Sequence, residues 1–256
     1  MPTFSVPGAE LDYATDGSGP PLVMLHGLTS SRENEIRNRL DFRSLRDTHT
    51  VTAYDARGHG RSTGRTEPDD YRWPQLADDL LALIDHLHPD EPVDALGVSM
   101  GVGTLLHAAT THPDRFRRLV LVIPPTAWQT RAAQADVYRD GADLVEAQGS
   151  RALARAARLL PLPPAQADLP ERVAPDIPDK LLAAAFRGAA VSDLPAPEAI
   201  SQLEQPTLIL AWADDPGHPT ETAERLFDLL PVVELNVAHT PGQRDAWAQM
   251  ATDHLG

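Results

Sequence analysis

Short apolar runs alternate along this chain with longer segments of helical periodicity, and this alternation limits the possible folds more than any other feature. The runs are residues 21–25, 50–54, 93–96, 119–123, 207–211 and 232–237. Most positions in them are apolar, which is typical of strands buried on both faces of a parallel sheet.

Helical patterns separate these runs. Residues 75–87 place Leu76, Leu80 and Leu83 on one stripe with the 3.6-residue period. Similar patterns cover residues 100–111, 220–229 and 244–255. The alternation predicts an α/β fold, with a mostly parallel central sheet covered by helices on both faces. Residues 4–6 and 11–15 are expected to form an antiparallel edge hairpin around Pro7-Gly8.

The alternation stops between residues 126 and 197. This segment has helical stretches at 128–147, 150–159 and 180–191, separated by proline clusters. We expect a small helical cap over the carboxyl edge of the sheet, where open α/β folds bind ligands. The core would then consist of residues 1–125 and 198–256. A disordered proline-rich linker is the alternative.

Composition excludes several classes of function. The net charge is −15 and Lys180 is the only lysine, so we expect no binding to nucleic acid or to a membrane surface. The chain has no cysteine, which excludes disulfides, thiolate metal sites and a cysteine nucleophile. No apolar stretch is long enough to span a membrane, and the first residues lack the features of a signal peptide, so a cytoplasmic protein is expected.

The segment Gly97-Val98-Ser99-Met100-Gly101 lies between a strand pattern and a helix pattern. G-x-S-x-G in that context predicts a nucleophile elbow, a strained turn that exposes the serine hydroxyl and needs small neighbours. A glycine-rich turn with a spectator serine is the alternative. We interpret Ser99 as a nucleophile.

A serine nucleophile needs a base and an acid. Among the ten histidines, His239 follows the last strand run and precedes the C-terminal helix pattern, on the same sheet edge as Ser99. His239 is therefore the predicted base. Asp214 and Asp215 follow the run at 207–211, and either one can supply the acid. A turn or helix-cap role is the alternative for both.

The oxyanion of an acyl-transfer intermediate needs two donors. The expected donors are the backbone N–H groups of Met100, after the nucleophile, and of Leu28, in the loop after an early strand. His26, in the same loop, is expected to be structural.

Together, these motifs resemble those of the α/β-hydrolase superfamily, and the resemblance covers nearly the whole chain. Four blocks match in order: residues 25–27, 55–62, 97–101 and the loop before His239. In the family the acid follows a glycine by three positions and precedes a proline by four. Pro219 fits that pattern for Asp215, so the resemblance favours Asp215 as the acid. Trp212 in the glycine position and Ala238 before His239 depart from the pattern.

The resemblance implies a serine hydrolase similar to the esterase, enol-lactonase and cofactor-free perhydrolase branch. It implies cleavage of a small ester or lactone through an acyl-enzyme, with no cofactor and no metal. The expected pocket walls are Trp128, Tyr138 and Phe186, and internal packing is their alternative. Carbon–carbon bond hydrolysis, perhydrolysis and natural-product tailoring on the same triad remain open, as does a noncatalytic receptor or scaffold. A monomer or a homodimer is expected.

Overall fold

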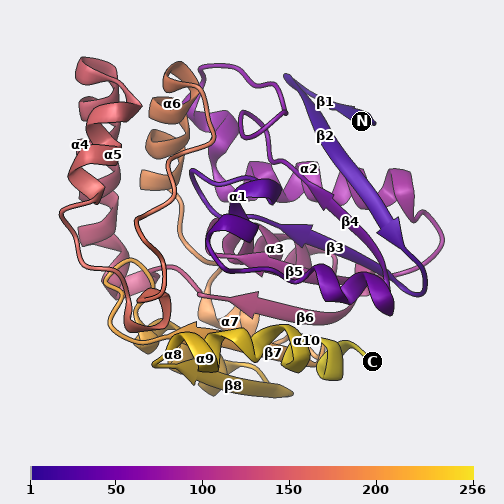
Figure 1. The fold of residues 1–256 in the computed structure, drawn as a ribbon. Coiled ribbons are helices and arrows are strands. Elements are labelled where there is room, and N and C mark those ends of the chain that lie inside the picture. The colour runs from indigo at the N-terminus through magenta and orange to yellow at the C-terminus, as the bar shows by residue number, and fades with distance from the viewer. Residues whose placement is uncertain (1) are drawn as a thin grey trace.

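Eight strands form one sheet at the centre of the computed structural model, which describes residues 2–256 (Figure 1). The strands are β1 (Thr3–Val6), β2 (Ala9–Gly17), β3 (Pro21–Leu25), β4 (Thr50–Tyr54), β5 (Val93–Val98), β6 (Phe116–Val122), β7 (Thr207–Trp212) and β8 (Val233–Ala238). Their order is β1-β2-β4-β3-β5-β6-β7-β8. β2 runs antiparallel to both of its neighbours. The other strands of this order, β4, β3, β5, β6, β7 and β8, are parallel to one another.

The predicted N-terminal hairpin is confirmed. β1 and β2 pair from Thr3 opposite Asp12 to Val6 opposite Ala9. The turn between them contains Gly8 with φ of 84°, a left-handed conformation that glycine adopts without the strain other residues incur. The hairpin gives the otherwise parallel sheet its antiparallel edge.

Side chains alternate between two faces of the sheet and build a separate apolar core on each. On β6, Leu119 and Leu121 belong to one core, whereas Val120 and Val122 belong to the other. Helices cover both faces, because strands buried on both sides require it. The predicted mostly parallel sheet with helices on both faces is therefore confirmed.

The first face packs against α2 (Trp73–Leu87), α3 (Met100–Thr111) and α8 (Thr220–Leu229). The second packs against η1 (Arg43–Asp47) and α10 (Trp247–Leu255). The remaining elements outside residues 123–206 are α1 (Arg32–Arg37), η2 (Pro68–Tyr71), η3 (Pro113–Arg115) and α9 (Pro241–Asp245). The C-terminal helical region begins with α9 at Pro241, whereas the sequence pattern predicts a start at residue 244.

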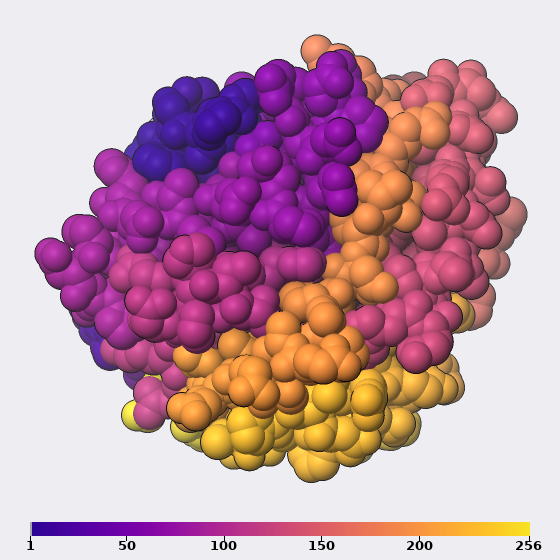
Figure 2. Space-filling view, turned by 180° about the vertical axis from the view of Figure 1, so that it is seen from behind, coloured from indigo at the N-terminus to yellow at the C-terminus, as the bar shows by residue number. Residues whose placement is uncertain are grey.

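The chain between β6 and β7 is helical. It contains η4 (Trp128–Thr130), α4 (Arg131–Gln148), α5 (Ser150–Ala157), η5 (Pro164–Gln166), α6 (Asp179–Ala190) and α7 (Pro197–Ile200). Figure 1 shows α4, α5 and α6 beyond the end of the sheet toward which the β6 arrow points. From behind, the part coloured orange runs along the boundary between the pink helices and the purple core (Figure 2). This segment therefore lies at the carboxyl end of the parallel strands.

A buried arginine ties the start of this helical segment to its end. Arg131 donates hydrogen bonds to the carbonyl oxygens of Ser192 and Ala189, at 2.7 and 2.6 Å. Its guanidinium also lies 4.3 Å from the centre of the Trp73 ring, at the start of α2. Burial lowers the pKa of Arg131. One side chain thus joins the helical segment to the sheet-covering helices.

Candidate active site

Ser99 lies at a sharp turn between β5 and α3. Its φ of 51° and ψ of −108° place the backbone in a region that residues with side chains rarely adopt. The Ser99 N–H donates to the carbonyl oxygen of Val122 at 3.0 Å, which holds the turn against β6. The partly exposed hydroxyl therefore stands at the carboxyl edge of the sheet.

The two glycines that flank Ser99 are required by close backbone contacts. A Cβ on Gly97 would lie 2.5 Å from the carbonyl oxygen of Gly101. A Cβ on Gly101 would lie 2.7 Å from the carbonyl oxygen of Leu25. Because backbone atoms cannot move aside as a flexible side chain can, the prediction that these neighbours must be small is confirmed.

The hydroxyl of Ser99 is hydrogen-bonded to the imidazole of His218. Ser99 Oγ and His218 Nε2 are 2.8 Å apart. The other ring nitrogen, Nδ1, lies 2.9 Å from Asp215 Oδ2. If Nδ1 carries the proton and donates it to the carboxylate, Nε2 is left to accept from the serine hydroxyl. Ser99, His218 and Asp215 thus form one continuous hydrogen-bonded chain.

The Asp215 carboxylate is held by three donors. Oδ2 accepts from the Trp212 indole N–H at 2.9 Å as well as from His218, and Oδ1 accepts from the Gly217 N–H at 3.0 Å. Burial alone raises the pKa of Asp215, but the His218 charge and these hydrogen bonds outweigh it and lower that pKa well below its usual range. The carboxylate is therefore charged throughout the ordinary pH range.

The loop that carries both side chains follows β7, and hydrogen bonds fix it to its neighbours. The Ala213 N–H donates to Ala238 at the end of β8, and the Thr126 N–H donates to Gly217. Within the loop, Asp214 has a left-handed φ of 59° and is exposed, whereas Asp215 points inward to His218. Of the two aspartates left open by the residues alone, the structure brings Asp215 to the serine.

The pairing of His239 with Ser99, predicted from the sequence, is wrong in this structure. His239 is exposed, and its backbone N–H donates to Gln243 Oε1 at 2.7 Å. The cause is the short connection after β8, because Thr240 already caps α9. β8 is three strands from β5, roughly 14 Å at the usual strand spacing, and β7 is two, roughly 10 Å. Within the plane of the sheet, the loop after β7, which carries His218, is therefore nearer to Ser99 than the turn after β8.

His218 is the residue in contact with Ser99 that the sequence-based prediction does not include. The predicted base is the histidine that directly follows the last strand run, whereas His218 lies inside the loop that carries Asp215. A signal was present, since His218 follows Asp215 by three residues and precedes Pro219, the residue that caps α8. Such a spacing lets an aspartate and a histidine in one turn meet.

The loop after β3 lies directly against Ser99. A Cβ on Gly27 would be 3.4 Å from the Ser99 Cβ. The Gly27 carbonyl lies 2.8 Å from His26 Nδ1, and the other nitrogen of His26 accepts from the Ala56 N–H at 2.9 Å. Since Ala56 can only donate, Nδ1 of His26 carries the proton and donates to Gly27. The structural role expected for His26 is thus to orient this peptide.

A trans peptide points its N–H away from its carbonyl. The Gly27 carbonyl faces His26, so the Leu28 N–H in the same peptide points to the opposite side. The Gly27 N–H in turn donates to the buried carboxyl of Glu35 at 2.8 Å. Burial raises the pKa of Glu35, against the opposing effect of the Gly27 hydrogen bond. The loop is thereby fixed on both sides of Gly27.

Met100 is the first residue of α3, directly after Ser99. The first N–H groups of a helix have no partner within that helix and carry its partial positive charge. The Met100 N–H is therefore a donor at the same edge of the sheet as Ser99 and the loop at Gly27.

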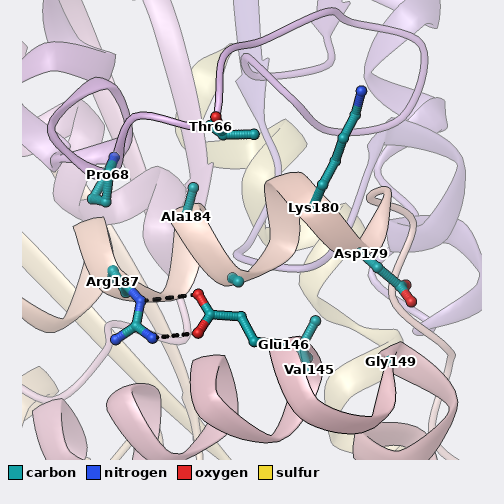
Figure 3. A pocket seen from close by; sticks show the side chains of 10 residues that line it. Thr66, Pro68, Val145, Glu146, Gly149, Asp179, Lys180, Ala184 and Arg187 are labelled. Carbon is teal, nitrogen blue, oxygen red and sulfur yellow. Dashed lines mark hydrogen bonds and ion pairs between the residues drawn. The ribbon is translucent and has the colours of Figure 1, made fainter.

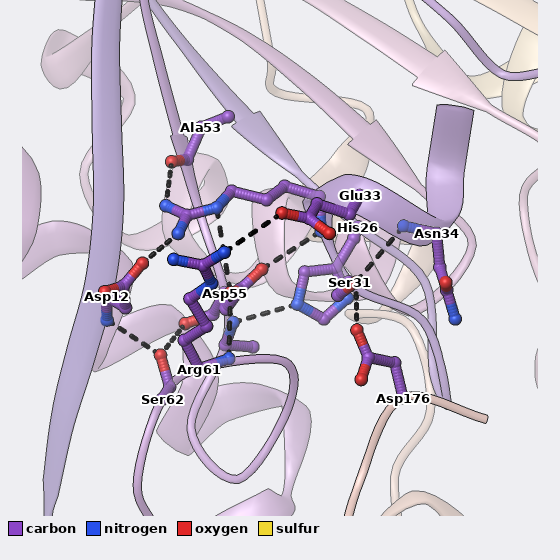
Figure 4. A network of polar contacts seen from close by, with 12 residues as sticks. Asp12, His26, Ser31, Glu33, Asn34, Ala53, Asp55, Arg61, Ser62 and Asp176 are labelled. Carbon is purple, nitrogen blue, oxygen red and sulfur yellow. Dashed lines mark hydrogen bonds and ion pairs between the residues drawn. The ribbon is translucent and has the colours of Figure 1, made fainter. Parts of the chain in front are cut away.

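A polar network supports this loop from behind (Figure 4). Arg32 pairs with Asp12 and Asp55, and Asp55 also accepts from the Arg61 N–H at 3.0 Å. The block at residues 55–62 is thus tied to the start of α1.

The helical segment is attached to the same loop. Ser31 Oγ donates to Asp176 at 2.7 Å, and the Asp176 N–H donates to the Thr29 carbonyl at 2.8 Å. Thr29 has a left-handed φ of 65°, which is strained for a residue with a side chain. The hydrogen bond from Asp176, far away in the chain, holds it in that conformation. Residues near 176 therefore fix the shape of the loop beside Ser99.

The three expected pocket-wall residues pack within the molecule. Phe186 is buried in the apolar cluster of α4 and α6, and Tyr138 stacks on it with ring centres 5.8 Å apart. Trp128 packs against the core of the first face and donates its indole N–H to the Pro195 carbonyl. Leu28 also contacts the α4–α6 cluster, so it is Leu28 that joins this cluster to the loop at Ser99.

A separate hollow of about 490 Å³ lies between α4, α6 and residues 66–68. Figure 3 shows Arg187 paired there with Glu146, and Ser99 is not part of its lining. Within residues 2–256, no group of three or more His, Asp or Glu side chains is arranged to hold a metal ion. No helix in the same range is long and apolar enough to cross a membrane.

Comparison with known proteins matches the α/β-hydrolase fold family model to residues 20–240. A 3-oxoadipate enol-lactonase of Acinetobacter baylyi is 30% identical over 225 residues, which cover 84% of this chain and 79% of that protein. A hydrolase structure from Pseudomonas aeruginosa has a TM-score of 0.84 at 25% identity, covering 100% of this chain and 98% of that one.

An enol-lactonase structure from Burkholderia xenovorans has a TM-score of 0.80 at 23% identity and covers 99% of both chains. At that identity the likeness supports the fold alone. The family model, in contrast, spans most of the sequence, including the loop at Gly27, the turn at Ser99 and the loop at Asp215. The chain therefore belongs to the α/β-hydrolase family.

Proposed function

We propose that this protein hydrolyses a carboxylic ester or a lactone, with Ser99 as nucleophile, His218 as general base and Asp215 as the acid that orients the base. The observation that carries the proposal is the hydrogen-bonded chain from Ser99 Oγ through His218 to Asp215, with distances of 2.8 and 2.9 Å. The 30% identity to an enol-lactonase over most of the chain supports the substrate class.

Acylation begins when Ser99 Oγ attacks the carbonyl carbon and its proton passes to His218 Nε2. The imidazolium that forms is stabilised by Asp215, which its hydrogen bonds keep ionised. The negative charge develops on the former carbonyl oxygen. The backbone N–H groups of Leu28 and Met100 are the donors we assign to it.

The tetrahedral intermediate collapses when His218 gives its proton to the leaving alkoxide oxygen. An alcohol is released from an ester, whereas the new hydroxyl of an opened lactone stays on the acyl group. Water then attacks the acyl-enzyme, and its proton passes to His218. The Ser99–acyl bond breaks with return of that proton to Ser99, which releases the acid and restores the enzyme.

The side chains behind the oxyanion loop prepare these donors before substrate arrives. His26 turns the Gly27 carbonyl away, and Glu35 holds the Gly27 N–H. A preorganised donor needs no reorganisation when charge develops, which makes it more effective than a mobile one. His26 and Glu35 act through the Gly27–Leu28 peptide and are positioning residues.

We assign residues 126–197 as a cap on a core of residues 1–125 and 198–256. Two observations support the assignment: the helices of this segment lie beyond the carboxyl end of the sheet (Figure 1), and Asp176 contacts the loop beside Ser99. A cap in this position would shield the acyl-enzyme from bulk water.

Replacement of Ser99 tests the proposal. We expect Ser99→Ala to lower hydrolysis of p-nitrophenyl acetate by at least about a thousandfold, because the nucleophile is lost. A fluorophosphonate probe should add covalently to the unaltered protein, with the adduct mapped to Ser99 by peptide mass spectrometry. Circular dichroism checks that the variant is folded. Full turnover by the folded variant, or an adduct elsewhere, would contradict the proposal.

A further inference from the structure

We propose that Trp212 is a positioning residue for the reaction, whose indole N–H fixes the Asp215 carboxylate and thereby the orientation of His218. This inference rests on the proposed function. Trp212 stands where the family commonly has glycine, so the role assigned here belongs to this chain's own site.

The indole and the imidazole share one acceptor atom. Trp212 Nε1 lies 2.9 Å from Asp215 Oδ2, and His218 Nδ1 lies 2.9 Å from the same oxygen. The two rings meet edge to face, at 84° with centres 6.2 Å apart. The indole therefore limits where the carboxylate oxygen can sit, and its ring limits how the imidazole can tilt.

The indole is itself held rigidly. Trp212 is the last residue of β7 and is 3% exposed, whereas His218 lies on the loop beyond the strand. It stacks on Trp247 of α10, with ring centres 6.1 Å apart and planes 22° from parallel. Trp247 donates its own indole N–H to Asn236 on β8 at 3.0 Å. Trp212 thus links a loop-borne carboxylate to the rigid sheet.

This link compensates for an acid and a base that share one short loop. Asp215 and His218 are three residues apart, and the His218 N–H donates to the Asp215 carbonyl at 3.0 Å, so their backbones are bonded to each other. The groups that lower the pKa of Asp215 are His218, the neutral indole N–H of Trp212 and the Gly217 N–H, acting against burial. Of these, only the indole comes from a strand.

The N–H also moderates the charge that Asp215 presents to His218. A neutral donor on Oδ2 disperses part of the carboxylate's negative charge. Without it, the carboxylate attracts the imidazolium form of His218 more strongly, so the base stays protonated to a higher pH. Loss of the donor should therefore move the acid limb of the pH profile of kcat/KM to higher pH.

The test compares Trp212→Phe with Trp247→Phe. Both replacements keep an aromatic ring in the stack and remove one buried indole N–H, but only the first removes a donor to Asp215. For Trp212→Phe we expect kcat to fall about tenfold, equivalent to one hydrogen bond to a charged group, with KM within about twofold. The midpoint of the acid limb in the pH profile of kcat/KM should rise by about half a pH unit. Trp247→Phe keeps the donor to Asp215, so it should lower kcat less than Trp212→Phe does and leave the acid limb of the pH profile unchanged.

An unchanged kcat and acid limb in Trp212→Phe would overturn the inference, as would equal changes in the two variants, because a packing role alone would explain those. If Trp212→Phe does not fold, replacement of Trp212 by benzothienylalanine, in which sulfur takes the place of the N–H, keeps the ring shape and should give the same shift.

The outcome is separable from the proposed function. An inactive Ser99→Ala together with an unaltered Trp212→Phe would remove only the role of Trp212. An active, folded Ser99→Ala would remove the proposed function itself.

Discussion

Two neighbouring loops at the carboxyl edge of the sheet each carry a histidine, and they differ in what their geometry allows. The loop after β7 has seven residues, 213–219, and turns inward so that His218 meets Ser99. The turn after β8 has two residues, His239 and Thr240, before α9 begins. The difference shows that the length of a connection, and the strand from which it starts, decide which side chain reaches the site.

Chain order does not distinguish the two histidines. Ser99, Asp215 and His218 follow one another in the same order as Ser99, Asp215 and His239, so a serine–aspartate–histidine order fits both. What differs is the coupling between acid and base. His218 and Asp215 belong to one loop and move together, whereas His239 is attached to a different strand.

The strongest test of this comparison replaces each histidine in turn. We expect His218→Gln to lower kcat/KM for an ester substrate by about a thousandfold, because Ser99 loses its base. His239→Gln should stay within about twofold of the unaltered protein. The measurement is steady-state hydrolysis with p-nitrophenyl acetate. A large loss in His239→Gln with little change in His218→Gln would reverse the conclusion.

A second test separates the two adjacent aspartates of the longer loop. Asp215→Asn should reduce kcat by about a hundredfold or more, since an amide can neither stabilise the imidazolium nor fix the same ring tautomer. Asp214→Asn, at an exposed position, should leave kcat within about twofold. Stopped or continuous ester assays on both variants measure this. Equal losses would indicate that the charge of the loop matters rather than the contact with His218.

Acid unfolding must be separated from protonation of the base, and a buried histidine in the core makes this possible. Burial, with a smaller effect from His26, lowers the pKa of His59 from 6.5 to about 3. The unfolded chain therefore binds a proton at His59 more readily than the folded protein between these pH values. The free energy of unfolding should fall by up to about 5 kcal/mol as the pH drops through that range.

Urea denaturation at several pH values measures this loss of stability. His59→Gln should make the stability less dependent on pH in that window, while leaving the acid limb of kcat/KM where it is. If His59→Gln moved the acid limb, the limb would report unfolding rather than the base next to Ser99.

The smallest effect is expected at the turn after β8. The Thr240 hydroxyl accepts from the Gln243 N–H and caps α9. Thr240→Ala should lower the free energy of unfolding by about 1 kcal/mol, because that helix end loses its cap. Activity should not change. Thr240→Ser, which keeps the hydroxyl, is the matched control, and a marked loss of activity in Thr240→Ala alone would give this turn a role in the reaction.

Local sequence patterns were enough to predict the sheet, the helices on its two faces and the turn at Ser99. These features depend on local patterns: near-continuous apolar runs, a 3.6-residue period, and glycines two positions from the serine, where Gly97 and Gly101 face backbone atoms. The sequence also placed Asp215 in the right loop, because a residue directly after a buried strand must lie at the carboxyl edge.

The folded chain was needed to show which histidine meets Ser99 and that the Trp212 indole hydrogen-bonds to Asp215. Both answers depend on distances across strands that are far apart in the chain. The start of α9 at Pro241 shortens one connection, and the stacking of Trp212 on Trp247 joins β7 to α10. A linear pattern states which residues follow a strand, but loop length, strand order and packing determine where their side chains point.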